Sequence, residues 1–136
     1  MKKLDLVNKQ ITSIKEYPLI KCIFTDNIIY NDNDLKINLY LYINQTEYNE
    51  VYKIISNEME LYNILVHNID KNDDNALVSS YYYENSLNIN IYYLFNYNYL
   101  IKNNIVSLYD PYNILNNFNS QKFPLTNKEF ANSIDL

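Results

Sequence analysis

The chain has 136 residues, 48% of them hydrophobic, which is enough to bury one core, so we expect a single domain over residues 1–136. The formal net charge is -5 and all eleven basic residues are scattered lysines, which argues against nucleic acid as a partner because phosphate binding requires clustered cations. The absence of glycine excludes a Walker loop and a dinucleotide fingerprint, and no apolar run is long enough for a membrane span.

The beginning of the chain and its cysteine content bear on where the protein works. The first ten residues, MKKLDLVNKQ, lack the apolar region of a secretory signal. The single cysteine, Cys22, has no second thiol for an internal disulfide or a thiolate metal site, which agrees with a reducing compartment. We therefore expect a cytoplasmic protein with no membrane partner. The lack of Gly, Trp and Arg beside abundant Asn, Ile, Lys and Tyr indicates an AT-rich gene.

The first half of the chain predicts two helices and two strands. Apolar residues recur at spacings of three and four from Leu4 to Ile14, which is typical of an amphipathic helix that ends at Pro18. The stretch KINLYLYI alternates aliphatic and polar residues, as a half-buried strand does, and Asn44 with Glu47 has the spacing of a capping box. The predicted elements are a helix over 3–16, a strand over 19–24, a loop over 25–34, a strand over 36–43 and a helix over 44–59.

The second half predicts four strands separated by polar turns. Because the chain has no glycine, Asn and Asp are expected at turn positions with left-handed backbone. A turn at Asp110-Pro111-Tyr112-Asn113 is followed by a polar tail over 118–136, in which Thr126 and Glu129 indicate a short C-terminal helix. The predicted strands cover 61–67, 76–83, 87–95 and 104–110. The whole order favours an α+β fold, with a mixed sheet and helices packed mainly on one face.

Several of these segments also carry recognisable local patterns. They are PLIKCIF as the first strand, LKINLYLYI as the second, TEYNEVYKIISNEM as the helix after it, LNINIYYLF as a later core strand and IVSLYDPYNIL as the closing strand and turn. In order and pattern, residues 4–118 resemble the core of the nucleotidyltransferase superfamily, close to the N-terminal domain of bacterial aminoglycoside and lincosamide nucleotidyltransferases. The family's helical substrate domain has no counterpart here beyond its first turns, at about residues 126–136.

The resemblance implies where a catalytic site would lie. In that family a Gly-Ser pair follows the first strand, two carboxylates two residues apart begin the second, and a third carboxylate lies on a later strand. The three carboxylates hold two Mg²⁺ ions, because Mg²⁺ prefers hard anionic oxygens and two metals stabilise both the attacking and the leaving oxygen. Carried onto this sequence, the Gly-Ser pair falls at Thr25 and Asp26, the carboxylate pair at Lys36 and Asn38, and the third carboxylate at Asn90.

None of these positions retains the family's residue. Asn38 and Asn90 keep the shape of Asp without its charge, and Lys36 places a cation where a metal ion would sit; like charges about 4 Å apart repel by roughly 4 kcal/mol at an effective dielectric of about 20. The resemblance therefore implies the fold, but a catalytically inactive protein without a metal cofactor. Its remaining role would be to bind another protein, or a small ligand in the former cleft.

Two alternatives remain open. The pair Asp32 and Asp34 keeps the spacing of two, so an active Mg²⁺-dependent nucleotidyltransferase would use these carboxylates if the register were four residues earlier. The same two aspartates can instead belong to a solvated, Asn- and Asp-rich turn that binds no metal. The second alternative to the inactive protein is a structural interaction module of unrelated α+β fold.

The remaining candidate residues favour structural roles. His67 has no cluster of Cys, Asp or Glu around it in sequence, and Cys22 lies inside an apolar strand as a small buried hydrophobe. The tyrosines are more informative, because consecutive strand residues point to opposite faces and some must therefore be exposed. AT-rich coding and the ordinary preference of tyrosine for strands explain this excess without an interface and are the favoured interpretation. The alternative is a protein interface, which exposed tyrosine suits, and a homo-oligomer is compatible with this surface. The tyrosines concerned are Tyr81, Tyr82, Tyr83, Tyr92, Tyr93, Tyr97 and Tyr99.

Overall fold

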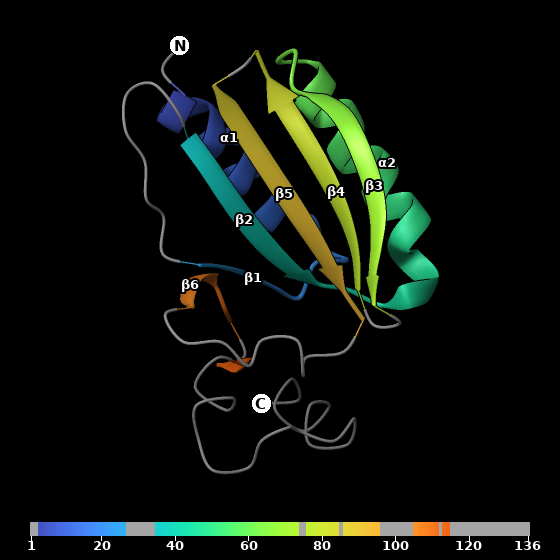
Figure 1. Ribbon diagram of the computed structural model, residues 1–136. Helices are drawn as coiled ribbons and strands as arrows, with labels where there is room; N and C mark the ends of the chain where they lie inside the picture. Colours follow the sequence, from blue (N-terminus) through green and yellow to red (C-terminus); the bar gives the residue numbers. More distant parts are fainter. Residues whose placement is uncertain are drawn as a thin grey trace.

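The protein has an α+β fold, seen in a computed structural model that describes residues 3–26, 35–73, 76–84, 86–95, 105–111 and 113–114. A mixed six-stranded sheet is packed against two helices (Figure 1). The elements are α1 (Lys3–Lys15), β1 (Cys22–Thr25), β2 (Leu35–Tyr42), a 3-10 turn η1 (Gln45–Glu47), α2 (Tyr48–Glu60), β3 (Leu65–Asp73), β4 (Ala76–Tyr83), β5 (Leu87–Leu94) and β6 (Val106–Tyr109). Neither described helix has the length and apolar character needed to cross a membrane.

The strands lie side by side in the order β3-β4-β5-β2-β1-β6. All neighbouring strands are antiparallel except β2 and β5, which run parallel and are joined through α2, β3 and β4. At one end of the sheet β1 and β6 turn away from the direction of the other four strands, as the twist of a sheet allows (Figure 1). The first two strands of the chain are neighbours, since β1 pairs with β2.

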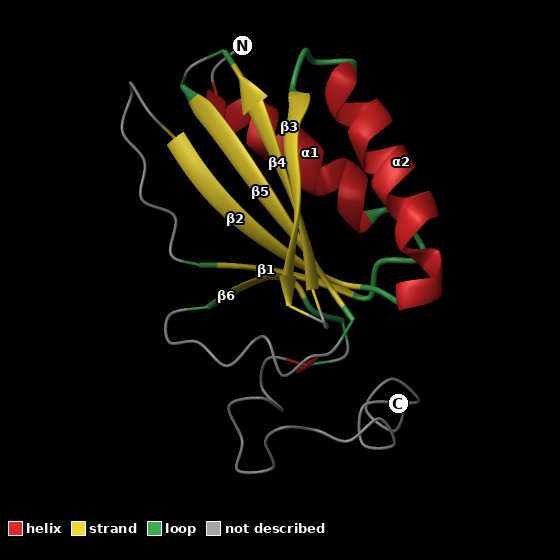
Figure 2. Cartoon of the chain, turned by 45° about the vertical axis from the view of Figure 1, so that its right-hand side comes forward, coloured by secondary structure: helices red, strands yellow, loops and turns green. Residues whose placement is uncertain are grey.

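Both helices cover the same side of the sheet, as the two views in Figures 1 and 2 show. The odd-numbered residues of β2 and β5 point to this side, and they form one buried cluster with the apolar faces of α1 and α2. In α2 the buried residues are Val51, Ile55 and Met59, whose spacing of four places them on one face of the helix. Helix 3–16 and strands 36–43, 76–83 and 87–95 are each confirmed to within one residue at either end.

Three predicted boundaries are wrong. The first strand begins at Cys22 rather than at residue 19, because the backbone turns after Pro18, where Ile20 N–H donates to the Tyr17 carbonyl. Asn44 precedes the turn η1 rather than α2, and its side chain makes no capping bond, so the capping box is not formed.

The third error is the strand predicted over 61–67. Residues 61–63 instead end α2: Ile64 N–H bonds to the Met59 carbonyl and Asn63 N–H to that of Glu60, which is the Schellman motif. Asn63 has φ 61°, the left-handed position that glycine usually fills. The strand consequently begins at Leu65 and continues to Asp73, six residues beyond its predicted end.

The expectation about turns is largely met in the described part of the chain. The residues with positive φ there are Asn63, Glu84 and Asn113, and two of these three are asparagine. At the turn after β6, the Asp110 carboxylate accepts the Ile114 N–H at 2.6 Å, as Asp does in helix and turn starts. The predicted tail over 118–136 lies outside the described residues.

Candidate functional site

The side of the sheet opposite the helices carries an unusual set of polar side chains. In the parallel pair of β2 and β5, Lys36 lies beside Asn88, Asn38 beside Asn90, and Tyr40 beside Tyr92. These residues are all even-numbered, so they share the face that the buried aliphatic residues do not use. We use the name polar cluster for the linked residues of this face, which are Asp26, Asn38, Tyr40, Asn88, Asn90 and Tyr92.

Asn90 lies at the centre of the polar cluster and is only 8% exposed. Its Nδ2 donates to the Oδ1 atoms of both Asn38 and Asn88, each at 3.0 Å. Asn88 returns a bond from its own Nδ2 to Asn90 Oδ1 at 3.3 Å and a second to the Tyr81 carbonyl at 3.2 Å. The amides thus satisfy one another, which compensates the cost of removing polar groups from water.

Asp26 supplies the carboxylate of the polar cluster. Its Oδ2 accepts bonds from Asn38 Nδ2 at 3.2 Å and from the Tyr40 hydroxyl at 2.8 Å. The neighbouring Thr25 hydroxyl donates to the Asn38 main-chain carbonyl, which ties the end of β1 to β2. The structure therefore brings Thr25, Asp26, Asn38 and Asn90 together, with Lys36 two residues before Asn38 on the same face of β2.

Two tyrosines close the other end of the polar cluster. Tyr40 is fully buried and its ring stacks on that of Tyr92, with centroids 4.7 Å apart. Burial raises the pKa of Tyr92, and the negative charge of Asp26 raises it further. The Tyr92 hydroxyl is therefore protonated at neutral pH, while the Tyr40 hydroxyl is the donor to Asp26.

The donor set of the polar cluster does not fit a two-magnesium centre. Such a centre needs several anionic oxygens, but the cluster has one carboxylate, and the amide oxygens of Asn38 and Asn90 already accept bonds from other amides. Lys36 adds an exposed cation on the same face. Across the described residues, no group of three or more His, Cys, Asp or Glu side chains is placed to hold a metal ion.

The other predicted site residues are distributed differently. Asp32 and Asp34 lie outside the described residues, and of His67 only the backbone, within β3, is described. Cys22 is a buried free thiol, as predicted, and burial, more than the nearby Asp110 charge, raises its pKa well above the ordinary value. A low-pKa nucleophile is therefore not found at this position.

The tyrosine-rich strands divide between the two faces. Tyr81 and Tyr93 are fully buried beneath α2, whereas Tyr82 is 41% exposed. Tyr83 and Tyr92 are half-buried, and Tyr97 and Tyr99 lie outside the described residues. Of the predicted aromatic surface, the described part of the chain contributes chiefly Tyr82.

Sequence reasoning missed Tyr40, Asn88 and Tyr92 as members of the polar cluster. A simple signal could have found them, since polar residues repeat with a period of two through 36, 38 and 40 and again through 88, 90 and 92. The sequence does not reveal that β2 and β5 pair in parallel, in the register that places residues 36, 38 and 40 beside residues 88, 90 and 92.

Comparisons with protein-family models, with curated proteins and with solved structures find no match. The nucleotidyltransferase resemblance thus stays a prediction made from the residues. The functional inference therefore rests on the geometry of the polar cluster.

Proposed function

We propose that this protein is a catalytically inactive, nucleotidyltransferase-like protein that works by binding a partner or a small ligand at the polar face of its sheet. The observation that carries the proposal is the contact between Asn38 and Asn90. Their amides lie in register on neighbouring strands and bond at 3.0 Å, at the two positions where the resemblance expects carboxylates. An amide pair can hold this geometry without a cation, whereas two carboxylates at that distance would repel.

The electrostatics of the same face support a binding role rather than metal-dependent phosphoryl transfer. Lys36 is positive, Asn38 and Asn90 are neutral, and Asp26 is engaged by two hydrogen bonds. Catalysis of nucleotidyl transfer depends on metal ions that neutralise phosphate charge, and this donor set offers them few anionic ligands. The exposed Tyr82 provides an aromatic surface of the kind enriched at binding interfaces, and the exposed Lys36 adds a positive charge that favours a partner of opposite sign.

The first test is a titration of the wild-type chain with Mg²⁺ and nucleoside triphosphates, followed by calorimetry and by thermal melting. We expect no heat of binding and no shift in melting temperature up to millimolar ligand. Metal-dependent nucleotide binding that disappears in the Asp32→Asn and Asp34→Asn variants would contradict the proposal. The metal ligands would then be Asp32 and Asp34, four residues before the positions that the resemblance assigns.

A second test restores the carboxylates that the resemblance expects. The triple variant Lys36→Asp, Asn38→Asp and Asn90→Asp should gain Mn²⁺ and Mg²⁺ binding, seen as a metal-dependent rise in melting temperature. A matched control, Lys53→Asp, Asn8→Asp and Asn44→Asp, changes the net charge by the same amount at exposed positions and should gain none.

Because Asn90 is buried, the triple variant could fail to fold without metal. The double variant Lys36→Asp and Asn38→Asp leaves Asn90 in place and should still gain weak metal binding. A folded double or triple variant that binds metal no better than the control would overturn the nucleotidyltransferase-like assignment and favour an unrelated α+β interaction module.

A further inference from the structure

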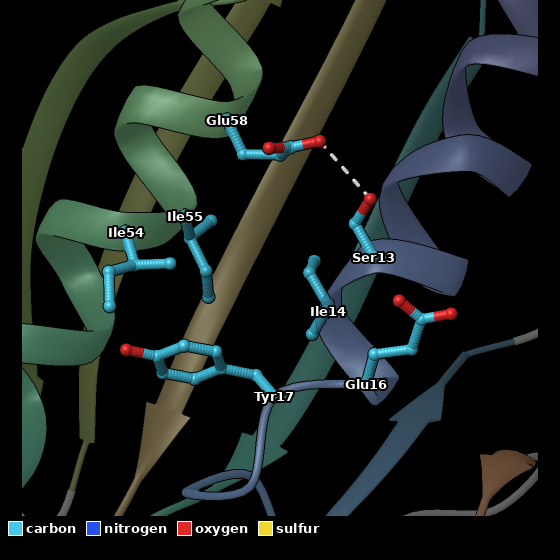
Figure 3. A pocket seen from close by; sticks show the side chains of 7 residues that line it. All are labelled: Ser13, Ile14, Glu16, Tyr17, Ile54, Ile55 and Glu58. Carbon is cyan, nitrogen blue, oxygen red and sulfur yellow. Dashed lines mark hydrogen bonds between the residues drawn. The ribbon is translucent and has the colours of Figure 1, made fainter.

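The two helices enclose a hollow on the opposite side of the sheet from the polar cluster (Figure 3). Its volume is about 290 Å³, and its lining residues are Ser13, Ile14, Glu16 and Tyr17 from the α1 side and Ile54, Ile55 and Glu58 from α2. Ile14 and Ile55 are buried and form an apolar floor, while Ile54 is 37% exposed at the side. The hollow therefore offers apolar surface that no other described residue covers.

The hollow is acidic. Glu58 reaches it from α2 and Glu16 from the turn that follows α1, and none of the seven described lining residues is basic. The Glu58 carboxylate accepts a bond from the Ser13 hydroxyl at 3.1 Å, which holds it across the gap between α1 and α2. Burial raises the pKa of Tyr17, and the charge of Glu50 raises it further, so a third carboxylate contributes to the negative potential here.

A second hollow continues the first along α1. It has a volume of about 450 Å³, shares Ser13 with the first, and is lined also by Asp5, Asn8, Lys9, Thr12 and Tyr62. The Lys9 ammonium group lies over the Tyr62 ring, 5.3 Å from its centroid, and this cation–π contact partly satisfies its positive charge within the chain. From Asp5 to Ile14 the groove follows about 14 Å of helix axis and then continues past the end of α1 to Tyr17, a length that suits a peptide better than a single small molecule.

We propose that this groove binds a short, basic amphipathic segment of a partner protein. Apolar side chains of the segment, or the hydrocarbon stems of its Lys and Arg residues, pack on Ile14, Ile54 and Ile55. The cationic ends then lie beside Glu16 and Glu58, where charge complementarity selects a basic partner over an acidic one. Nucleic acid and anionic membranes are excluded by the same carboxylates, which repel phosphate.

The probe is a fluorescent peptide of about 14 residues built from Leu and Lys at helical spacing, roughly 20 Å long when helical. The full chain should bind it in fluorescence anisotropy, and should not bind the same peptide with Glu in place of Lys. A peptide with Ser in place of Leu keeps the charge and removes the apolar face, so it should bind much more weakly. Equal binding of the Ser and Leu peptides would overturn the proposal in favour of unspecific attraction to an acidic protein.

Two double variants separate the groove from general charge attraction. Glu16→Gln with Glu58→Gln should weaken binding about tenfold, as expected for two partly exposed ion pairs. The control Glu60→Gln with Glu84→Gln removes the same charge from exposed sites outside the groove and should leave affinity within about twofold.

An equal loss of affinity in both double variants would contradict the proposed site. The Ile54→Ser variant should also weaken binding, because it removes apolar surface from the groove without changing the charge. The triple variant at Lys36, Asn38 and Asn90 should bind the peptide normally if folded, so failure of this inference is distinguishable from failure of the proposed function.

Discussion

The two faces of the sheet are built from the same strands but are stabilised differently. On the helix-covered face, Leu39, Ile89 and Ile91 are fully buried among aliphatic side chains. On the opposite face, Asn38 and Asn90 occupy neighbouring positions of the same strands and are held by mutual hydrogen bonds. Burial of apolar area favours the first face whatever the detailed geometry, whereas the second depends on each donor meeting its acceptor. Such a difference is expected where one face of the sheet forms the hydrophobic core and the other forms a binding site.

Alkaline pH is expected to act most strongly on the helix-covered face, because the pKa of its buried Tyr93 is raised well above the ordinary value, whereas that of Tyr92 on the opposite face is raised less. Burial raises the pKa of Tyr93 well above its ordinary value, with Tyr81 adding to the shift, and burial likewise raises the pKa of Tyr81. Below about pH 10 these tyrosines are protonated in both folded and unfolded chains and stability is unaffected. Above it the unfolded chain releases protons first, so stability should fall by about 1.4 kcal/mol per pH unit for each proton retained.

Denaturant unfolding between about pH 8 and pH 11 measures this loss. The Tyr93→Phe variant lacks the most deeply buried of the two hydroxyls and should show a shallower fall in stability above about pH 10. If the variant and the wild type lose stability in parallel, the alkaline sensitivity does not come from Tyr93 and the expected role of this hydroxyl is wrong.

Truncating a side chain to alanine should cost more stability on the helix-covered face than on the opposite face. Ile91→Ala removes a fully buried side chain beneath the helices and should destabilise the fold by about 2 to 5 kcal/mol. Asn88→Ala, on the opposite face of the same strand, removes hydrogen bonds from a half-buried position and should cost about 1 kcal/mol. Urea unfolding of the two variants tests the comparison, and similar losses would mean that the polar cluster is as much a part of the core as the aliphatic layer.

The fold was predictable from the sequence where periodicity was strong. Alternation in KINLYLYI and the three- and four-residue spacing in α1 each reflect burial of one face, and both elements are confirmed within a residue of their predicted ends. The errors arose where backbone hydrogen bonds decided the structure. Residues 61–63 have strand-like composition, but the Schellman motif at Asn63 uses them to end α2, a choice that depends on bonds to Met59 and Glu60.

The polar cluster was predictable only in part, for a different reason. Asn38 and Asn90 were singled out through a resemblance and indeed lie in register. Tyr40 and Tyr92 were not, since their contact follows from the parallel pairing of strands that are some fifty residues apart in sequence, as are Asn38 and Asn90. Hydrogen-bonded networks of this kind carry no local pattern beyond an alternation of polar residues, so a single sequence indicates the face but not the partners.

The smallest effect is expected from the one glutamine that departs from the apolar character of the helix-covered face. Gln10 in α1 is 1% exposed, and neither its amide nitrogen nor its oxygen has a hydrogen-bond partner among the described residues. Leucine has a similar volume and similar helix propensity, so Gln10→Leu removes a buried polar group without opening a cavity and should raise stability by about 1 kcal/mol. Thermal and urea unfolding measure the gain, with Gln45→Leu at an exposed position as the matched control that should change little. A loss of stability in Gln10→Leu would show that the amide contributes a bond to the fold, and that the helix-covered face, like the opposite one, relies on a satisfied polar group.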